Sequence, residues 1–201
     1  MNAAVLAVDG GNSKTDVALV AADGTLLAAV RGPTTSHQAV GLEPGIQRLV
    51  GLVEQAATMA GLDPSVRPIS TIGVHAAAGA DFPSDVRLIE GGLRRVRLST
   101  QDVVVNDCLG ALWSGASEGW GIVLICGEGV NGAAVAPNGR TVRFDGIGAL
   151  SGDWGGGGAV GMAGLSAAVR ARDGRGPRTT LETVVPAHFG LKRPSAVTRA
   201  M

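Results

Sequence analysis

The residues of this chain best suited to chemistry stand in short glycine-rich segments. Residues 9–14 read Asp-Gly-Gly-Asn-Ser-Lys and directly follow an apolar run. A carboxylate at a strand end, a glycine turn and a hydroxyl can together hold Mg²⁺ and phosphate, because glycine lets backbone N–H groups approach phosphate oxygens. The segment lacks the spacing of a Walker A loop and is expected to join two strands. The alternative is an ordinary glycine-rich hairpin with Asp9 as a capping residue.

A second segment has a similar make-up. Residues 127–131 read Gly-Glu-Gly-Val-Asn and also follow an apolar run. Taken alone, this segment is equally well explained as a hairpin turn. Two such loops at equivalent positions of a duplicated fold could clamp a triphosphate from both sides, so the pair is more informative than either loop.

A third candidate is Asp107, which follows the apolar residues 103–105 and precedes a helical pattern. A carboxylate at this position can point into a cleft and act as a general base toward a substrate hydroxyl. Asp107 or its neighbour Asn106 could equally cap the helix, because both residue types serve well as N-caps. The local sequence leaves both interpretations open.

Composition narrows the function classes. The 201 residues carry 17 Lys+Arg and 17 Asp+Glu, so the formal net charge is zero. The chain therefore lacks the excess positive charge that would favour binding to nucleic acid or to an anionic membrane. Apolar runs are far shorter than the ~20 residues of a membrane span. The first residues lack the basic region and cleavage site of a signal peptide. We therefore expect a cytoplasmic protein with neither a nucleic-acid nor a membrane partner.

The two cysteines, Cys108 and Cys126, form neither a disulfide framework nor a zinc pattern. Both lie in apolar surroundings, so we expect both to be buried, reduced thiols.

The elements that must position the candidate residues follow from hydrophobic periodicity. The first half of the chain predicts a β-meander, in which Asp9 ends the first strand, and then an amphipathic helix. Further strands and a helix with Ser84 as its N-cap complete this half. The expected strands cover 3–9, 15–21, 25–31, 70–75 and 103–105, and the expected helices cover 41–60 and 84–90.

The plan of strand, glycine loop, strand, turn and strand returns in the second half. Strands are expected over 121–126, 132–136 and 140–145, and helices over 159–172, 179–189 and 195–201. We interpret this as an internal duplication with two related α/β domains, residues 1–117 and 118–201. The second domain is expected to be truncated, because its last helical pattern reaches the final residue without a cap or returning strands.

The motifs, taken in order, resemble those of the BadF/BadG/BcrA/BcrD ATPase family, and most closely its N-acetylglucosamine kinases. The resemblance covers all 201 residues and rests on five segments: Asp9 to Thr15, Gly79-Ala80-Asp81, Asn106-Asp107, Gly127-x-Gly129-x-Asn131 and Ser151-Gly152-Asp153. It implies the ribonuclease H-like α/β fold of the actin/hexokinase/Hsp70 superfamily. It further implies an ATP-dependent sugar kinase with Mg²⁺ as cofactor. Full-length members run roughly half as long again, as a two-domain kinase would, and carry their adenosine-binding motif in the part absent here.

The resemblance also implies roles for individual residues. Asp107 corresponds to the catalytic base, and Asp9 to a residue near Mg²⁺. The residues implied to hold the nucleotide phosphates are Asp9, Gly10, Gly11, Asn12, Ser13, Lys14, Gly127, Glu128 and Gly129. Those implied to contact an acetamido sugar are Ser36, His37, Asp81, Asn106, Asn131, Gly152 and Asp153. Residues 1–201 alone are expected to show no turnover, and a homodimer is an open expectation.

Two positions depart from the pattern of the kinases. Glu128 stands where Thr or Ser is common, and Trp154 with Gly155 replaces a Glu-Gly-Ser continuation. A carboxylate beside a triphosphate repels it. A nucleotide- or sugar-binding sensor without turnover is therefore one alternative. Another is the activator ATPase of 2-hydroxyacyl-CoA dehydratases or benzoyl-CoA reductases, which carries a cysteine-ligated iron–sulfur cluster.

Overall fold

The computed structural model describes residues 3–148 and 151–200. The chain divides into two compact units. One comprises Met1–Val123 and Ala133–Arg143, and the other comprises Leu124–Gly132 and Phe144–Met201. The predicted domain boundary between residues 117 and 118 stays a prediction.

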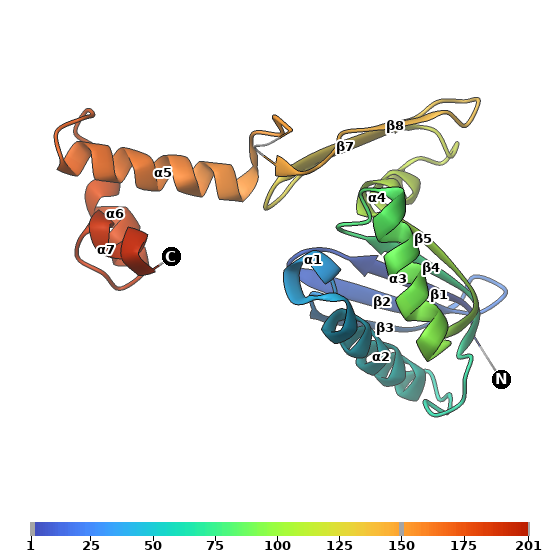
Figure 1. Cartoon of the computed structure of the whole chain (residues 1–201). Helices are drawn as coiled ribbons and strands as arrows, with labels where there is room; N and C mark the ends of the chain where they lie inside the picture. The colour runs from blue at the N-terminus through green and yellow to red at the C-terminus, as the bar shows by residue number, and fades with distance from the viewer. Residues whose placement is uncertain (1–2, 149–150, 201) are drawn as a thin grey trace. The chain divides into compact units, whose positions relative to one another are not determined.

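The first unit is built on a five-stranded mixed sheet (Figure 1). The strand order is β3-β2-β1-β4-β5. The predicted meander is confirmed, since β2 pairs antiparallel with β1 and β3, whereas β4 runs parallel to β1 and to β5. The strands are β1 (Ala3–Gly10), β2 (Lys14–Val20), β3 (Leu26–Pro33), β4 (Ser70–Ala77) and β5 (Ser99–Asn106).

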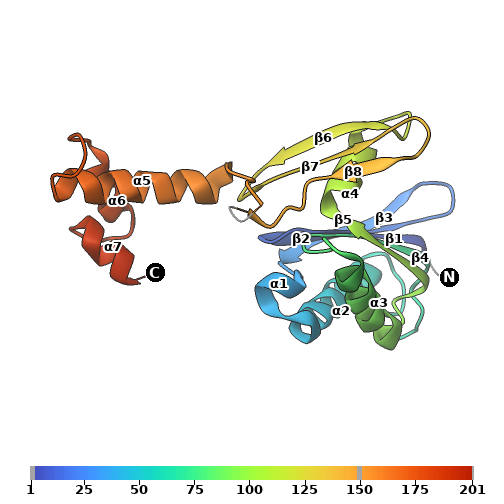
Figure 2. The same cartoon turned by 45° about the horizontal axis from the view of Figure 1, so that its top comes forward.

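Helices cover both faces of this sheet (Figure 2). The helices α1 (His37–Val40), α2 (Leu42–Met59) and α3 (Pro83–Val96) lie on one face, and α4 (Asp107–Gly115) lies on the other. The predicted helix over 41–60 is confirmed as α2. Its buried residues Ile46, Leu49, Val53 and Ala57 recur every three or four positions, so they form one apolar stripe toward the core.

Helix α3 is longer than predicted and begins differently. Its N-cap is Phe82, not Ser84, and the Phe82 backbone N–H donates to Asp85 Oδ2 at 2.8 Å. The expected end at residue 90 is wrong, because the helix continues through Gly91 and Gly92 to Val96. A Cβ at Gly92 would lie 2.9 Å from Ile46 Cδ1, so glycine lets α3 approach α2 closely.

Strand β5 also exceeds its predicted range of 103–105. Residues 99–102 are polar, so the hydrophobic pattern does not predict this part of the strand. In the sheet, the buried Ser99 hydroxyl pairs with that of Ser70 at 2.8 Å, which satisfies both groups.

A second sheet has the strand order β6-β7-β8, with β7 and β8 antiparallel. Its strands are β6 (Gly121–Cys126), β7 (Val130–Val135) and β8 (Thr141–Arg143). The sheet repeats the plan of strand, glycine loop, strand, turn and strand. The expectation that Cys126 is buried is wrong. Alternate residues of β6 are exposed, and Cys126 falls on the same side as Ile122 and Leu124, which are 80% and 73% exposed.

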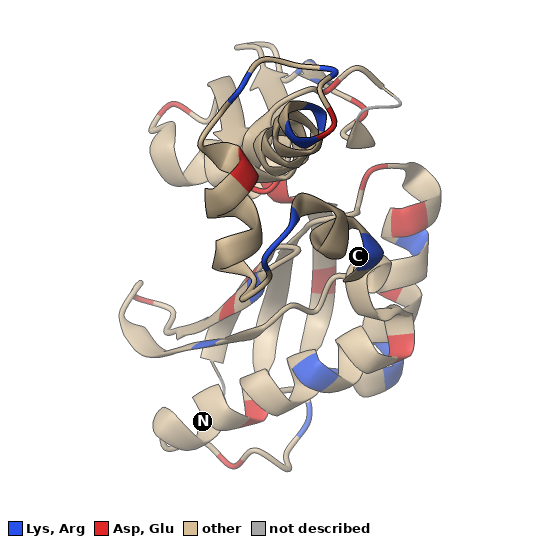
Figure 3. Cartoon of the chain, turned by 90° about the vertical axis from the view of Figure 1, so that its left-hand side faces the viewer, with Lys and Arg blue, Asp and Glu red and all other residues tan. Residues whose placement is uncertain are grey.

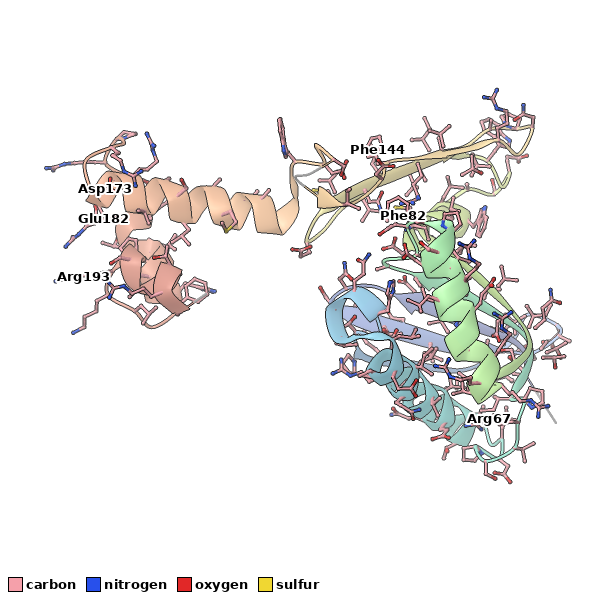
Figure 4. All side chains as sticks on the ribbon, in the orientation of Figure 1. Arg67, Phe82, Phe144, Asp173, Glu182 and Arg193 are labelled. Atoms are coloured by element: carbon pink, nitrogen blue, oxygen red, sulfur yellow. The ribbon has the colours of Figure 1, made fainter. Side chains whose placement is uncertain are left out.

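Three helices occupy the second unit: α5 (Gly156–Arg172), α6 (Leu181–His188) and α7 (Pro194–Ala200). They match the predicted helices to within a few residues, and Met201 lies outside the described residues. At the turn between α5 and α6, Arg172 Nη1 contacts Glu182 Oε1 at 3.0 Å, near the labelled Asp173 (Figure 4).

Within residues 3–148 and 151–200, no helix has the length and apolar character needed to cross a membrane. Figure 3 shows acidic and basic positions interspersed along the helices and loops. This pattern agrees with the zero net charge of the sequence.

Candidate functional site

The loops that follow β1, β4 and β5 meet at one edge of the first sheet. Because these strands are parallel, their carboxyl ends point the same way. The register places Gly10 opposite Ala77, and Ala77 opposite Asn106, in one row across the three strands. Asp9 and Asp107 lie on either side of this row, so the sheet gathers residues that are about 100 positions apart in sequence.

Asp107 is the first residue of α4, at the end of β5. Its Oδ1 accepts the backbone N–H of Cys108 at 3.0 Å. Burial raises the pKa of the Asp107 carboxyl, and the negative charges of Asp81 and Asp9 raise it further. The Cys108 hydrogen bond and the Arg143 guanidinium act in the opposite direction. A carboxylate with a raised pKa is a stronger proton acceptor than an exposed aspartate.

Asn106 supplies the helix cap. It is 4% exposed, and its Oδ1 accepts the Cys108 N–H at 3.1 Å as the N-cap of α4. Its Nδ2 donates to Asp81 Oδ1 at 3.0 Å. The capping interpretation from the sequence therefore applies to Asn106. The Asp107 carboxylate keeps acceptor capacity for a substrate.

Asp81 is the centre of a polar cluster. In addition to Asn106, it receives Arg143 Nη1 at 3.1 Å on Oδ1 and Gln38 Nε2 at 3.2 Å on Oδ2. Neither Arg143 nor Gln38 was a candidate from the sequence. A lone arginine in a short polar strand and a glutamine in a one-turn helix carry no motif, so no local signal could have identified them.

Ser36 and His37 lie at the start of α1. Ser36 Oγ and His37 Nδ1 are buried and have no hydrogen-bond partner among the described residues. Both residues line a cavity of about 40 Å³, together with Gly10 and Thr35. Gly79 approaches His37 closely, because a Cβ there would lie 3.0 Å from His37 Cε1. Orphaned buried polar atoms are uncommon and mark a place where a polar ligand or water would be stabilised.

The first glycine loop is closed by backbone and threonine contacts. The Gly11 N–H donates to Lys14 O at 2.9 Å, and the Thr34 hydroxyl donates to Gly11 O at 2.8 Å. Asn12 and Ser13 are exposed at the loop tip. Lys14 pairs with Asp16 at 3.4 Å. The loop joins β1 to β2, as predicted.

Asp9 is exposed at the end of β1. It borders an open groove of about 890 Å³ on the α4 side of the sheet, which is also lined by Asp16 and Arg31. Among the residues that the structure describes, no three His, Cys, Asp or Glu side chains form a cluster able to hold a metal ion.

The second glycine loop lies in the other unit and supports the start of α5. The N–H groups of Gly157 and Gly158 donate to Gly127 O at 2.7 Å and to Glu128 O at 2.9 Å. A Cβ at Gly156 would lie 2.6 Å from Glu128 O. The glycine run after Trp154 thus seats the helix directly on the loop. Gly129 O in turn accepts the Gly127 N–H at 2.9 Å.

The remaining predicted residues belong to this unit as well. Asn131 Oδ1 accepts the N–H of Gly132 at 2.8 Å. Asp153 accepts a short hydrogen bond from the Ser151 hydroxyl, and its N–H donates to Gly148 O at 3.2 Å. Gly152 has a φ of +82°, which favours glycine. In short, Asp81, Asn106 and Asp107 converge in the first unit, and residues 127–131 form a second cluster with residues 156–158.

The chain is similar to known proteins over most of its length. It is 33% identical over 182 residues to the N-acetylmuramic acid/N-acetylglucosamine kinase of Clostridium acetobutylicum, covering 89% of this chain and 57% of that protein. It is 27% identical over 190 residues to the N-acetyl-D-glucosamine kinase of Dictyostelium discoideum, covering 90% of this chain and 58% of the relative. The chain thus spans little more than half the length of these curated relatives.

A solved structure shows the same fold. A Chromobacterium violaceum protein proposed to be an N-acetylglucosamine kinase matches 98% of this chain and 67% of its own, at 24% identity and a TM-score of 0.81. This likeness confirms the predicted α/β fold. The BadF/BadG/BcrA/BcrD ATPase family matches residues 6–199, and the chain therefore belongs to this family.

Proposed function

We propose that the protein is an ATP-dependent kinase that phosphorylates a hydroxyl of an N-acetylated amino sugar. The observation that carries the proposal is Asp107, a half-buried carboxylate with a raised pKa at the edge where β1, β4 and β5 end. In this reaction Asp107 accepts the proton of the sugar hydroxyl as that oxygen attacks the γ-phosphoryl group. The family membership and the names of the two curated relatives support this reaction class.

The sugar-side residues are assigned by their chemistry. Ser36 and His37 offer unpartnered polar atoms that suit the carbonyl and N–H of an acetamido group. Asp81 and Asn106 lie beside Asp107 and suit ring hydroxyls. Asn131, Gly152 and Asp153 are proposed as further sugar contacts on the basis of the family resemblance.

The phosphate-side residues are those of the two glycine loops. On the basis of the family resemblance, these loops are proposed to lie along the nucleotide phosphates, with Gly10, Gly11, Asn12, Ser13 and Lys14 from the first loop and Gly127, Glu128 and Gly129 from the second. Mg²⁺ typically takes one or two carboxylates, with water and substrate phosphates as its other ligands. The exposed Asp9 at a strand end fits this donor set. When bound, Mg²⁺ would offset charge on the triphosphate.

The iron–sulfur activator hypothesis is weakened by the surroundings of Cys108. Cys108 is buried, and burial together with Asp107 raises the pKa of its thiol to about 11. A cluster ligand must be a thiolate, which this environment disfavours. The sensor reading has one specific observation in its favour, since Glu128 places a carboxylate in the proposed phosphate loop.

Turnover and binding distinguish the kinase from the sensor. Turnover is measured on a fused protein. In it, this chain is joined to the part of the Clostridium acetobutylicum relative that the match does not cover, because the chain alone spans 57% of that protein. ADP release is then followed with Mg·ATP across glucose, N-acetylglucosamine, N-acetylgalactosamine and N-acetylmuramic acid.

A kinase gives ADP release that depends on an N-acetylated sugar and on Asp107. Sugar binding by calorimetry without ADP release from any sugar would replace the kinase proposal with the sensor. A brown, iron-containing preparation would favour the activator. The ATP requirement fits a cytoplasmic location, which together with a homodimer stays a prediction.

A further inference from the structure

Arg143, the last residue of β8, makes a two-point contact with Asp81. Its Nη1 donates to Asp81 Oδ1 at 3.1 Å, and its Nη2 donates to the main-chain oxygen of the same residue. The two side chains are 17% and 5% exposed. An ion pair this far removed from water is costly to break on one side, because the remaining charge is left unpaired.

The acceptor capacity of Asp81 is shared among donors from three elements. Arg143 comes from β8, Asn106 from the end of β5 and Gln38 from α1. Asn106 is also the N-cap of α4, the helix that begins with Asp107. A continuous chain of hydrogen bonds therefore runs from Arg143 through Asp81 and Asn106 to the backbone that carries the proposed base.

Arg143 provides the positive charge that opposes the carboxylates around Asp107. The groups that act on Asp107 are Asp9 at the end of β1, Asp81 after β4 and Arg143 from β8. Two of these are carboxylates. The guanidinium is the cation among them, and it opposes their effect on Asp107.

We propose that Arg143 is a positioning residue of the site, which holds Asp81 and, through Asn106, fixes the direction of Asp107. This inference rests on the proposed kinase function. Arg143 acts through Asp81 and does not contact the reacting atoms. Its second effect is electrostatic, because a fixed positive charge keeps Asp107 ionised to lower pH.

The first test needs no turnover and uses residues 1–201. The Asp107 carboxyl is titrated by ¹³C NMR, and the Asn106 side-chain amide is observed in parallel. In Arg143→Ala we expect Asp107 to titrate at higher pH and the Asn106 amide protons to exchange faster. Arg143→Lys keeps the positive charge but loses the two-point guanidinium contact. In this variant Asp107 should titrate as in wild type, whereas the Asn106 amide protons should still exchange faster. Arg140→Ala, an exposed arginine of the same hairpin, is the matched control.

The second test uses the fused protein. We expect Arg143→Ala to lower kcat by about 10- to 100-fold with a smaller change in sugar KM, because displacing a base by about 1 Å can cost 10²-fold. The acidic limb of its pH–rate profile should move to higher pH. Combining Arg143→Ala with Asp81→Asn should cost less than the sum of the two changes.

These outcomes separate the inference from the function. If wild type releases no ADP with any sugar, the kinase proposal fails, and the NMR titration still decides the role of Arg143. An Arg143→Ala chain with unchanged Asp107 titration and unchanged Asn106 exchange would overturn the inference, even if the kinase is active.

Discussion

The contact between α5 and the second glycine loop gives a quantitative prediction at Gly156. This residue has a φ of +72°, and a Cβ there would lie 2.6 Å from Glu128 O and 2.7 Å from Gly129 C. Placing an alanine in the left-handed region costs about 1 kcal/mol. Displacing the loop to remove the overlap costs about 1–3 kcal/mol more. We therefore expect Gly156→Ala to destabilise the chain by about 2–4 kcal/mol, a Tm loss of roughly 5–15 °C at this chain length.

Gly161 provides the matched control in the same helix. Nothing lies within 4 Å of a Cβ at that position, so an alanine gains helix propensity without a clash. Gly161→Ala should stabilise the chain by about 0.5–1 kcal/mol. Thermal unfolding of both variants is followed by far-ultraviolet circular dichroism. A Gly156→Ala Tm equal to or above that of wild type would refute the close seating of α5 on the loop.

Three further predictions concern the site itself. Because burial raises the pKa of Asp107, ionisation of this group weakens folding as pH rises past its folded pKa. Asp107→Asn should therefore have a higher Tm than wild type at pH 7, and this difference in Tm should vanish below pH 3.8, the ordinary pKa of aspartate. A Tm difference that stays constant across a pH series would contradict this. Asn106→Ala removes the cap of α4 and a donor to Asp81, so urea unfolding should show a loss of about 1–2 kcal/mol; Asn106→Asp, which retains the capping oxygen, should lose the Asp81 contact but keep α4 helicity. Glu128→Gln removes a carboxylate from the proposed phosphate loop, so calorimetry on the fused protein should show Mg·AMPPNP binding about 5-fold tighter or better, as ~1 kcal/mol of relieved repulsion implies; unchanged affinity would place Glu128 away from the phosphates.

Much of this arrangement could be predicted because it is local in sequence. The β-meander, the stripe of α2 and the position of Asn106-Asp107 between a strand and a helix each follow from a few neighbouring residues. The carboxyl edge could be anticipated as well, since parallel strands deliver their ends to one side of a sheet.

What could not be predicted depends on pairing between distant segments. Arg143 and Asp81 are 62 positions apart, and nothing near either residue marks the partner. Gly92 has low helix propensity, yet it lies inside α3 and lets two helices approach. Cys126 ends an apolar strand, yet whether its side of that strand is covered depends on the neighbouring layers and not on the strand sequence.

If Asp107 removes the proton from the sugar hydroxyl, its replacement should slow the chemical step and spare sugar binding. This is measured by single-turnover phosphoryl transfer by the fused protein, with saturating Mg·ATP and N-acetylated sugar, in wild type and Asp107→Asn. Glu118→Gln, a change in an exposed loop carboxylate, serves as the control. We expect Asp107→Asn to slow transfer by about 10²- to 10⁴-fold while the sugar Kd stays within a few-fold of wild type. Transfer at the wild-type rate by Asp107→Asn would contradict it.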